Sequence, residues 1–483
     1  MSSVKEKVFS GLFWKFSERM LAQMISLIVS IILARILAPE DYGAVALVMV
    51  FISIANVFVS SGLGNALVQK KNADNLDFSS VFFINVGLSI IVYGIIYVIA
   101  PVAADFYSLD ILCPAMRVLG IAILFAGVNS VQHAYVSRHM MFKRFFWSTL
   151  FGTLLSGVVG VTMAYLGYGV WALVLQHLTN TCVDTVVLWV TVKWRPEPIY
   201  SWERAKSLIS YGWKLLAASL LDTGYRQLRG LIIGKIYTKS DLAFYNQGDK
   251  YPNMIAINVN ASIIGVLFPA FSQNQSDKNK LRSMVRRAIQ VSSTMMWPMM
   301  IGFAACSETI VRLVLTEKWL PCVPYIYCFC FSYGLWPIHT ANLQALNAMG
   351  RSDLFFKLEI IKKIIGIVAI LLSVKYGPFA IALSMVIAGL LATFINAHPN
   401  KALLGYSIFD QLKDMFPAFL ISIIMGVCIY PIKLLHCHDA LVLILQIVSG
   451  GLIYCLVSYA SRQEPFFYVI ELLTERLEKK HGR

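Results

Sequence analysis

One long apolar segment, residues 209–236, carries ionisable side chains at helical spacing. Lys214, Asp222, Arg226 and Arg229 fall on one face of the expected helix, and Asp222 lies four residues before Arg226, where the two can pair. Guanidinium groups in apolar surroundings bind carboxylates and phosphates through charge-assisted hydrogen bonds. The pattern therefore predicts an anion-binding face, with Arg226 and Arg229 as its strongest candidates. The alternative, which fits Lys214 equally well, is internal pairing together with side chains that extend toward water.

A second apolar segment, residues 12–37, has a similar polar start. Its polar residues are Lys15, Glu18, Arg19 and Gln23. The functional interpretation is that this segment and 209–236 both line one cationic cavity, suited to a diphosphate or an acidic sugar. Side chains that reach the membrane surface explain Lys15 and Glu18 equally well.

Asp184 lies in the middle of a third apolar segment, residues 170–192. Gln176, His177 and Asn180 precede it by one or two helical turns. An acidic residue inside a membrane span is a candidate for binding a coupling cation, and the alternative is a hydrogen bond to a neighbouring helix. We find no nucleotide-binding motif. His436-Cys437-His438 is a weak metal candidate, because neighbouring residues on one short loop rarely converge on one ion, so we expect no cofactor and no metal.

The composition places these segments in a membrane. Of the 483 residues, 58% are hydrophobic and 14% are charged, whereas a soluble domain is about 25% charged. Apolar runs of about twenty residues form helices that cross the ~30 Å hydrocarbon core. We therefore predict an all-α integral membrane protein with about fourteen transmembrane helices. Proline kinks are expected at Phe268-Pro269, Trp297-Pro298 and Trp336-Pro337. The helices are expected at 12–37, 42–63, 79–100, 111–136, 145–165, 170–192, 209–236, 251–271, 283–306, 322–346, 358–376, 379–397, 415–432 and 440–460.

The 41 lysines and arginines predict the orientation of these helices. With a cytoplasmic N-terminus, the stretches outside the expected spans carry 23 of them on the cytoplasmic side and 5 on the opposite side, as the positive-inside rule requires. The densest basic stretch, Ser276–Arg287, is expected to be a cytoplasmic loop. Both termini are then cytoplasmic. Because topology explains the basic charge, nucleic acid is not an expected partner.

Matches about 200 residues apart predict an internal repeat. Six helices in each repeat make the two repeats parallel, related by an axis along the membrane normal. We expect an N-terminal six-helix lobe in residues 1–200 and a second one in 201–400, around a central cavity. Residues 401–483 add two helices and a cytoplasmic tail. The matches pair Trp14-Lys15 with Trp213-Lys214, Arg35 and Asp41 with Lys235 and Asp241, and Gln132 and Arg138 with Gln344 and Arg351.

Nine short motifs follow one another along residues 8–400. They are LARILAPEDYGAVALV (33–48), GLGNALVQKK (62–71), APVAADFYS (100–108), SRHMMFKRF (137–145), GYGVWALVLQ (167–176), KWRP (193–196), LFPAFS (267–272), KWLPCVPYI (318–326) and NAMGRSDL (347–354). In type and order they resemble the Wzx-type lipopolysaccharide, colanic-acid and teichuronic-acid flippases. These belong to the multidrug/oligosaccharidyl-lipid/polysaccharide exporter superfamily.

The resemblance implies a function in surface polysaccharide and O-antigen biosynthesis. The chain is then a flippase of the bacterial inner membrane and not an enzyme. Its cargo would be undecaprenyl-diphosphate-linked oligosaccharide repeat units, moved from the cytoplasmic to the periplasmic leaflet by alternating access through a positively charged cavity. Implied partners are this substrate, membrane lipids, and polysaccharide polymerase and chain-length proteins.

Two alternatives remain at this point. A drug or cation antiporter of the same superfamily would share the fold, but it is expected to have a more acidic cavity. A membrane polysaccharide polymerase or ligase would need a larger external loop than any predicted here.

Overall fold

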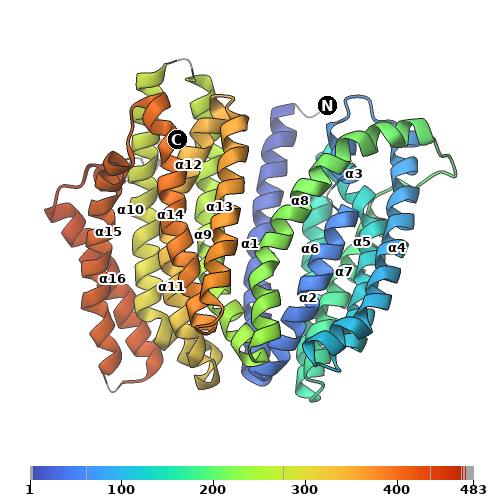
Figure 1. Cartoon of the computed structure of the whole chain (residues 1–483), viewed down its shortest axis with the longest axis horizontal. Helices are drawn as coiled ribbons and strands as arrows, with labels where there is room; N and C mark the ends of the chain where they lie inside the picture. The colour runs from blue at the N-terminus through green and yellow to red at the C-terminus, as the bar shows by residue number, and fades with distance from the viewer. Residues whose placement is uncertain are drawn as a thin grey trace. The chain divides into compact units, whose positions relative to one another are not determined.

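The computed structural model describes residues 4–60, 62–275, 277–435, 437–468, 470–471 and 474. All regular secondary structure in these residues is helical. The chain divides into two compact units, Met1–Ala243 and Phe244–Arg483. Within each unit the long helices run side by side (Figure 1). The first unit therefore extends past residue 200, because the long charged helix α8 (Trp202–Ile236) packs against α2 and α4.

The first unit consists of α1 to α8 over the described residues. α4 begins at a capping box, in which the side chains of Asp74 and Asp77 each accept the other's backbone N–H. Strong pairings within the unit join α6 to α7, α4 to α5 and α1 to α6. The helices that precede α8 are α1 (Val4–Ile36), α2 (Pro39–Ser60), α3 (Leu63–Gln69), α4 (Asn75–Tyr107), α5 (Leu112–Arg138), α6 (Phe142–Tyr165) and α7 (Val170–Thr191).

The second unit contains most of α9 and the helices α10 to α16. A π-helical turn (Val311–Leu315) and a 3-10 turn (Glu317–Cys322) follow α10, and another 3-10 turn (Tyr430–Leu434) follows α15. Its helices are α9 (Lys239–Gln273), α10 (Lys278–Ile310), α11 (Val323–Gly334), α12 (Trp336–Ala348), α13 (Ser352–Ser373), α14 (Pro378–Leu404), α15 (Ile408–Ile429) and α16 (Asp439–Ala460).

All fourteen predicted membrane segments coincide with helices. Ten spans in the described chain are long and apolar enough to cross a membrane. The other four segments correspond to α1, the charged helices α8 and α13, and the pair α11 and α12. The kink expected at Trp336-Pro337 is a break between α11 and α12 at Leu335, because proline has no N–H to continue the helical hydrogen bonds.

The prediction of a loop at Ser276–Arg287 is wrong, since α10 begins at Lys278. Asp277 caps this helix by accepting the N–H of Lys280 at 3.0 Å. Leu281, Val285 and Ile289 recur every four residues and are fully buried. The basic residues between them occupy the opposite, exposed face. The basic stretch therefore forms the first, amphipathic turns of α10.

Two turns that the sequence matches to each other have the same geometry. The Asp41 carboxylate accepts the N–H of Ala38 at 3.2 Å, and the Asp241 carboxylate accepts the N–H of Thr238 at 3.1 Å. The two turns are in contact: a Cβ on Gly43 would lie 1.9 Å from the carbonyl oxygen of Lys239. Glycine at this position therefore permits α2 and the start of α9 to touch.

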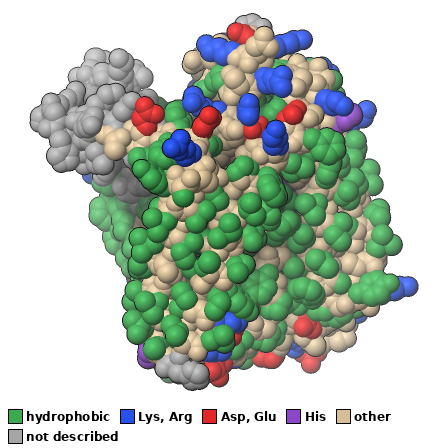
Figure 2. All heavy atoms as spheres, turned by 90° about the vertical axis from the view of Figure 1, so that its left-hand side faces the viewer, with side chains coloured by type: hydrophobic (Ala, Val, Ile, Leu, Met, Phe, Trp, Pro, Cys, Tyr) green, Lys and Arg blue, Asp and Glu red, His purple; other side chains and the backbone are tan. Residues whose placement is uncertain are grey.

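The surface of α15 and α16 is suited to lipid. Its exposed side chains are large and apolar, including Phe416 and Val427 on α15 and Ile444 and Leu456 on α16. Figure 2 shows this side of the molecule as apolar over most of its height, with Lys and Arg gathered toward one end. An apolar band with charge beyond it matches the profile of a bilayer.

Candidate functional site

Arg226 and Asp222 form the pair that their spacing predicts. The Arg226 Nε lies 2.9 Å from the Asp222 Oδ2, and the two side chains are 75% and 46% exposed. Asp222 therefore balances most of the charge that Arg226 brings to α8. This pair accounts for Arg226 without a bound anion.

Arg229 differs from Arg226 although it lies only three residues away. Its side chain is buried, with 8% of its surface exposed. The guanidinium lies 5.5 Å from the centre of the Tyr225 ring, within cation–π range, and its Nε has no hydrogen-bond partner among the described residues. A buried donor without a partner is costly, and no described residue relieves that cost at Arg229.

The other residues predicted for this site are not joined to Arg229 by any contact that the described chain shows. Lys214 is exposed on α8, and Gln23 is half-buried on α1. α1 packs strongly against α6, whereas α8 packs strongly against α2. The side chains of Lys15, Glu18 and Arg19 lie outside the described residues. A shared cavity of α1 and α8 thus stays a prediction.

Asp184 meets two residues of another helix. Its Oδ2 accepts a hydrogen bond from the Asn129 Nδ2 at 2.8 Å and lies 3.2 Å from the His133 Nε2. Both of these residues come from α5, and Ser148 of α6 also bonds to the carboxylate. The Phe145 ring stacks on His133, with 4.9 Å between the ring centres. Asn180, which the sequence places near Asp184, instead donates to Ser156.

The partners of Asp184 were missed by sequence reasoning. Asn129 and His133 are four residues apart on one helix face, and that spacing was the available signal. It could not show that α5 packs against α7, a tertiary contact. The resulting arrangement holds a carboxylate beside an imidazole that is 48% exposed, which is a geometry able to bind or exchange a proton.

A charged cluster closes the turn between α3 and α4. Asp77 is fully buried and pairs with the Lys70 ammonium at 2.7 Å. Arg138 donates to backbone carbonyls of this turn, including those of Leu67 at 3.0 Å and Lys71 at 2.8 Å. Arg204 pairs with Asp74 and lowers the pKa of that carboxyl below its ordinary value of 3.8. All these donors and acceptors serve each other, so the cluster is structural.

Polar side chains of α12 form hydrogen bonds to other helices. Asn342 donates to Gln411 at 2.7 Å and accepts from Asn400 at 2.6 Å, and all three side chains are fully buried. His339 lies 2.9 Å from the Thr393 hydroxyl. These bonds join α12 to α14 and α15. These polar side chains therefore hold α12 against its neighbouring helices.

The chain matches a known protein family over more than half of its length. Residues 32–324 match the model of a family described as polysaccharide biosynthesis protein. The chain belongs to this family. The match confirms the resemblance drawn from the motifs, and the family spans both compact units.

Curated relatives of this polysaccharide biosynthesis protein cover nearly its whole length. It is 25% identical over 433 residues to the lipopolysaccharide biosynthesis protein WzxC of Escherichia coli K12, covering 87% of this chain and 86% of WzxC. It is 24% identical to the succinoglycan biosynthesis transport protein ExoT of Rhizobium meliloti 1021, with 92% and 88% covered. It is 22% identical to the teichuronic acid biosynthesis protein TuaB of Bacillus subtilis 168, with 94% and 95% covered.

Solved structures show the fold. The chain superposes on the lipid II flippase MurJ with a TM-score of 0.73 at 16% identity, covering 93% of this chain and 99% of MurJ. A MATE family multidrug transporter of the MOP superfamily gives a TM-score of 0.60 at 14% identity, with 83% and 98% covered. The fold is therefore that of these multi-pass membrane transporters, which confirms the predicted all-α membrane class.

Proposed function

We propose that the chain is a flippase for lipid-linked oligosaccharide repeat units in surface polysaccharide biosynthesis. Its family and the names of its relatives supply the pathway. Its fold is shared with a lipid II flippase. The cargo we propose is an undecaprenyl-diphosphate-linked oligosaccharide, moved from the cytoplasmic to the periplasmic leaflet by alternating access.

The observation that best supports an anionic cargo is the burial of Arg229. A diphosphate offers oxygen acceptors that can receive the unpartnered N–H of this residue. Its neighbour Arg226 is already paired with Asp222. We therefore assign the first diphosphate contact to Arg229, with Arg226, Asp222 and Lys214 as candidate surrounding residues on the same helix.

The pair of Asp184 and His133 is our candidate for the site that couples transport to an ion gradient. The carboxylate lies within 3.2 Å of the imidazole and accepts a bond from Asn129. Binding of a proton or cation here changes the charge between α5 and α7. An ion that binds one conformation better than the other shifts the population toward it.

The same proposal gives the membrane, the orientation and the partners of the protein. The excess of basic residues at alternate helix ends favours cytoplasmic N- and C-termini, and the cargo places the protein in a bacterial inner membrane. A polymerase and chain-length proteins that use the exported unit are proposed partners. The chain carries cargo and catalyses no covalent step.

Deletion in the native host tests this proposal. Loss of a flippase leaves synthesis of the lipid-linked unit intact and makes completed units accumulate on the cytoplasmic face. The measurement is extraction of lipid-linked glycans combined with their accessibility to an impermeant glycosidase in spheroplasts. If units still reach the outer leaflet and polymer length alone changes, the chain acts after translocation and the proposal fails.

A further inference from the structure

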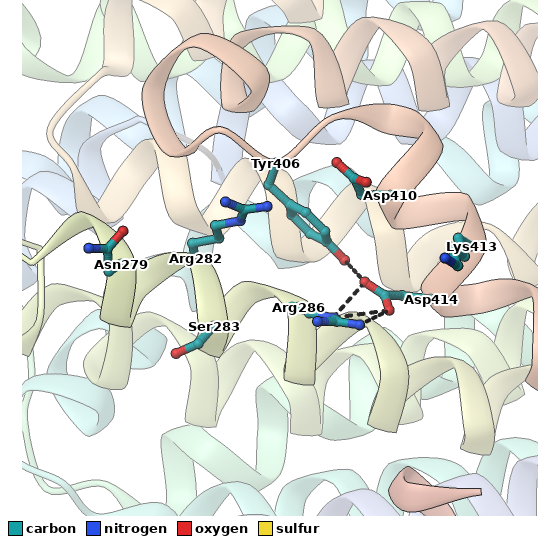
Figure 3. A pocket seen from close by; sticks show the side chains of 8 residues that line it. All are labelled: Asn279, Arg282, Ser283, Arg286, Tyr406, Asp410, Lys413 and Asp414. Atoms are coloured by element: carbon teal, nitrogen blue, oxygen red, sulfur yellow. Dashed lines mark hydrogen bonds and ion pairs between the residues drawn. The ribbon is translucent and has the colours of Figure 1, made fainter.

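A polar pocket of about 270 Å³ lies where α10 and α15 begin. Figure 3 shows its lining side chains, with Arg282 reaching from α10 toward Tyr406 and Asp410. The pocket is separate from α8, and none of the residues assigned to transport above belongs to it. Its lining consists of Asn279, Arg282, Ser283, Arg286, Tyr406, Asp410, Lys413 and Asp414.

One wall of the pocket is fixed and electrically balanced. Arg286 holds the Asp414 carboxylate with two nitrogens, Nε at 2.9 Å from Oδ2 and Nη2 at 2.9 Å from Oδ1. The buried Tyr406 hydroxyl donates to the same carboxylate at 2.8 Å, and Gln290 donates at 2.9 Å. Asp414 is only 8% exposed. With its oxygens occupied, it does not compete for a further cation.

The remaining charges leave the pocket positive. Asp410 completes the capping box of α15, where its carboxylate accepts the Ser407 hydroxyl at 2.6 Å and the Ser407 N–H at 3.1 Å. Arg282 and Lys413 are exposed and form no ion pair within the described part of the chain. Two cations therefore face one carboxylate that is already engaged. An anion with several oxygens would complete this arrangement.

The position of the pocket indicates where this anion comes from. It lies at the beginning of two membrane spans, Lys278–Leu315 and Ile408–Leu434. The exposed side chains that follow on α15 are apolar, among them Phe416 and Leu420. Figure 2 shows the same transition, from basic side chains near one end to an apolar surface. A ligand held here would have its charge in the pocket and its apolar part along α15.

We propose that this pocket binds the phosphate of an anionic phospholipid. The Arg282 guanidinium and the Lys413 ammonium donate to the phosphate oxygens, and Asn279 and Ser283 lie beside the headgroup. The acyl chains lie along the exposed face of α15. Basic pockets between transmembrane helices are known to hold anionic headgroups, and a zwitterionic lipid would not balance the excess charge.

The test uses the full chain in nanodiscs that contain phosphatidylglycerol and phosphatidylcholine in a defined ratio. Native mass spectrometry after release counts the bound phosphatidylglycerol. The double variant R282Q/K413Q should bind it at least tenfold more weakly, since each basic residue near a membrane surface contributes appreciably. The matched control is K278Q/K280Q, which removes the same charge from the same end of α10 but outside the pocket lining.

Each outcome decides the proposal. Retention of phosphatidylglycerol by the wild type and the control, with loss in R282Q/K413Q, supports a built site. Equal losses in both double variants would mean that diffuse surface charge attracts the lipid, and no loss would remove the site altogether. Displacement of the lipid by soluble glycerol phosphate would overturn the lipid assignment in favour of a free phosphate. If R282Q/K413Q does not elute as folded protein, the single exposed change K413Q repeats the test.

Discussion

Arg229 and Arg226 show how two identical side chains on one helix can differ in role. Arg226 is exposed and paired with Asp222. Arg229 is buried over Tyr225 with a donor left without a partner among the described residues. The sequence predicts the Asp222–Arg226 pair from spacing alone. It could not distinguish the burial of Arg229, because burial depends on how α8 packs against α2.

Substitution of Arg229 by glutamine should reduce surface polysaccharide at least tenfold. Glutamine keeps a hydrogen-bonding side chain but removes the charge that attracts a diphosphate. The matched control K206Q removes a positive charge from the exposed start of the same helix and should change polymer by less than twofold. Polymer is quantified in a deletion strain that expresses each variant, with membrane protein levels compared by blotting. Equal effects of the two variants would contradict a special role for Arg229.

Substitution of Asp184 by asparagine should uncouple transport. Asparagine preserves the size of the side chain and can still bond to Asn129, but it carries no charge beside His133. Export should fall about tenfold and become insensitive to collapse of the ion gradient. Asn180→Ala, which changes a neighbouring polar residue on α7 that bonds to Ser156, is the control. Wild-type export by D184N would remove this residue from the coupling step.

At the scale of elements, the sequence predicts where helices lie along the chain but not which helices contact each other. Apolar length locates all fourteen segments, and Pro337 marks the break between α11 and α12. The start of α10 was predicted to be a loop because it is densely basic. The four-residue spacing of its buried residues Leu281, Val285 and Ile289 was the signal for a helix. The network of Asn342, Asn400 and Gln411 joins three helices, so no single segment could reveal it.

The contact between α2 and the start of α9 predicts that Gly43 cannot be enlarged. An alanine Cβ would lie 1.9 Å from the Lys239 carbonyl oxygen, so the backbone has to move. We expect Gly43→Ala to destabilise the protein by about 1–3 kcal/mol, as other overpacked contacts do. Gly87→Ala is the control, since its Cβ would meet nothing within 4 Å. Thermal unfolding in detergent compares the two, and a Gly43→Ala protein as stable as Gly87→Ala would contradict the packing.

The turn before α4 predicts a small acid dependence of stability. Arg204 lowers the pKa of Asp74 in the folded protein. The stabilisation is therefore complete above the ordinary pKa of 3.8 and is lost as the pH falls through the lower, folded value. Asp74→Asn keeps the helix cap but should abolish this part of the pH profile. Melting temperatures between about pH 2 and pH 6 provide the measurement, and an unchanged profile in the variant would exclude Asp74 as the titrating group.

At the scale of the whole molecule, the chain has the fold of the MOP-superfamily transporters and belongs to the polysaccharide biosynthesis family. The turns at Asp41 and Asp241, which the sequence matches to each other, have the same hydrogen bond. A transporter of this fold gains its specificity from side chains rather than from topology. The identity of the cargo therefore has to be measured directly, by following its movement across a membrane.

That measurement is translocation by the purified full chain in proteoliposomes. A fluorescent lipid-diphosphate oligosaccharide is placed in one leaflet, and its arrival in the other is followed with an impermeant quencher. Our account predicts that the wild type accelerates arrival at least tenfold over empty liposomes and that R229Q does not. Arrival at the same rate in empty liposomes, or equal acceleration by the wild type and R229Q, would contradict it.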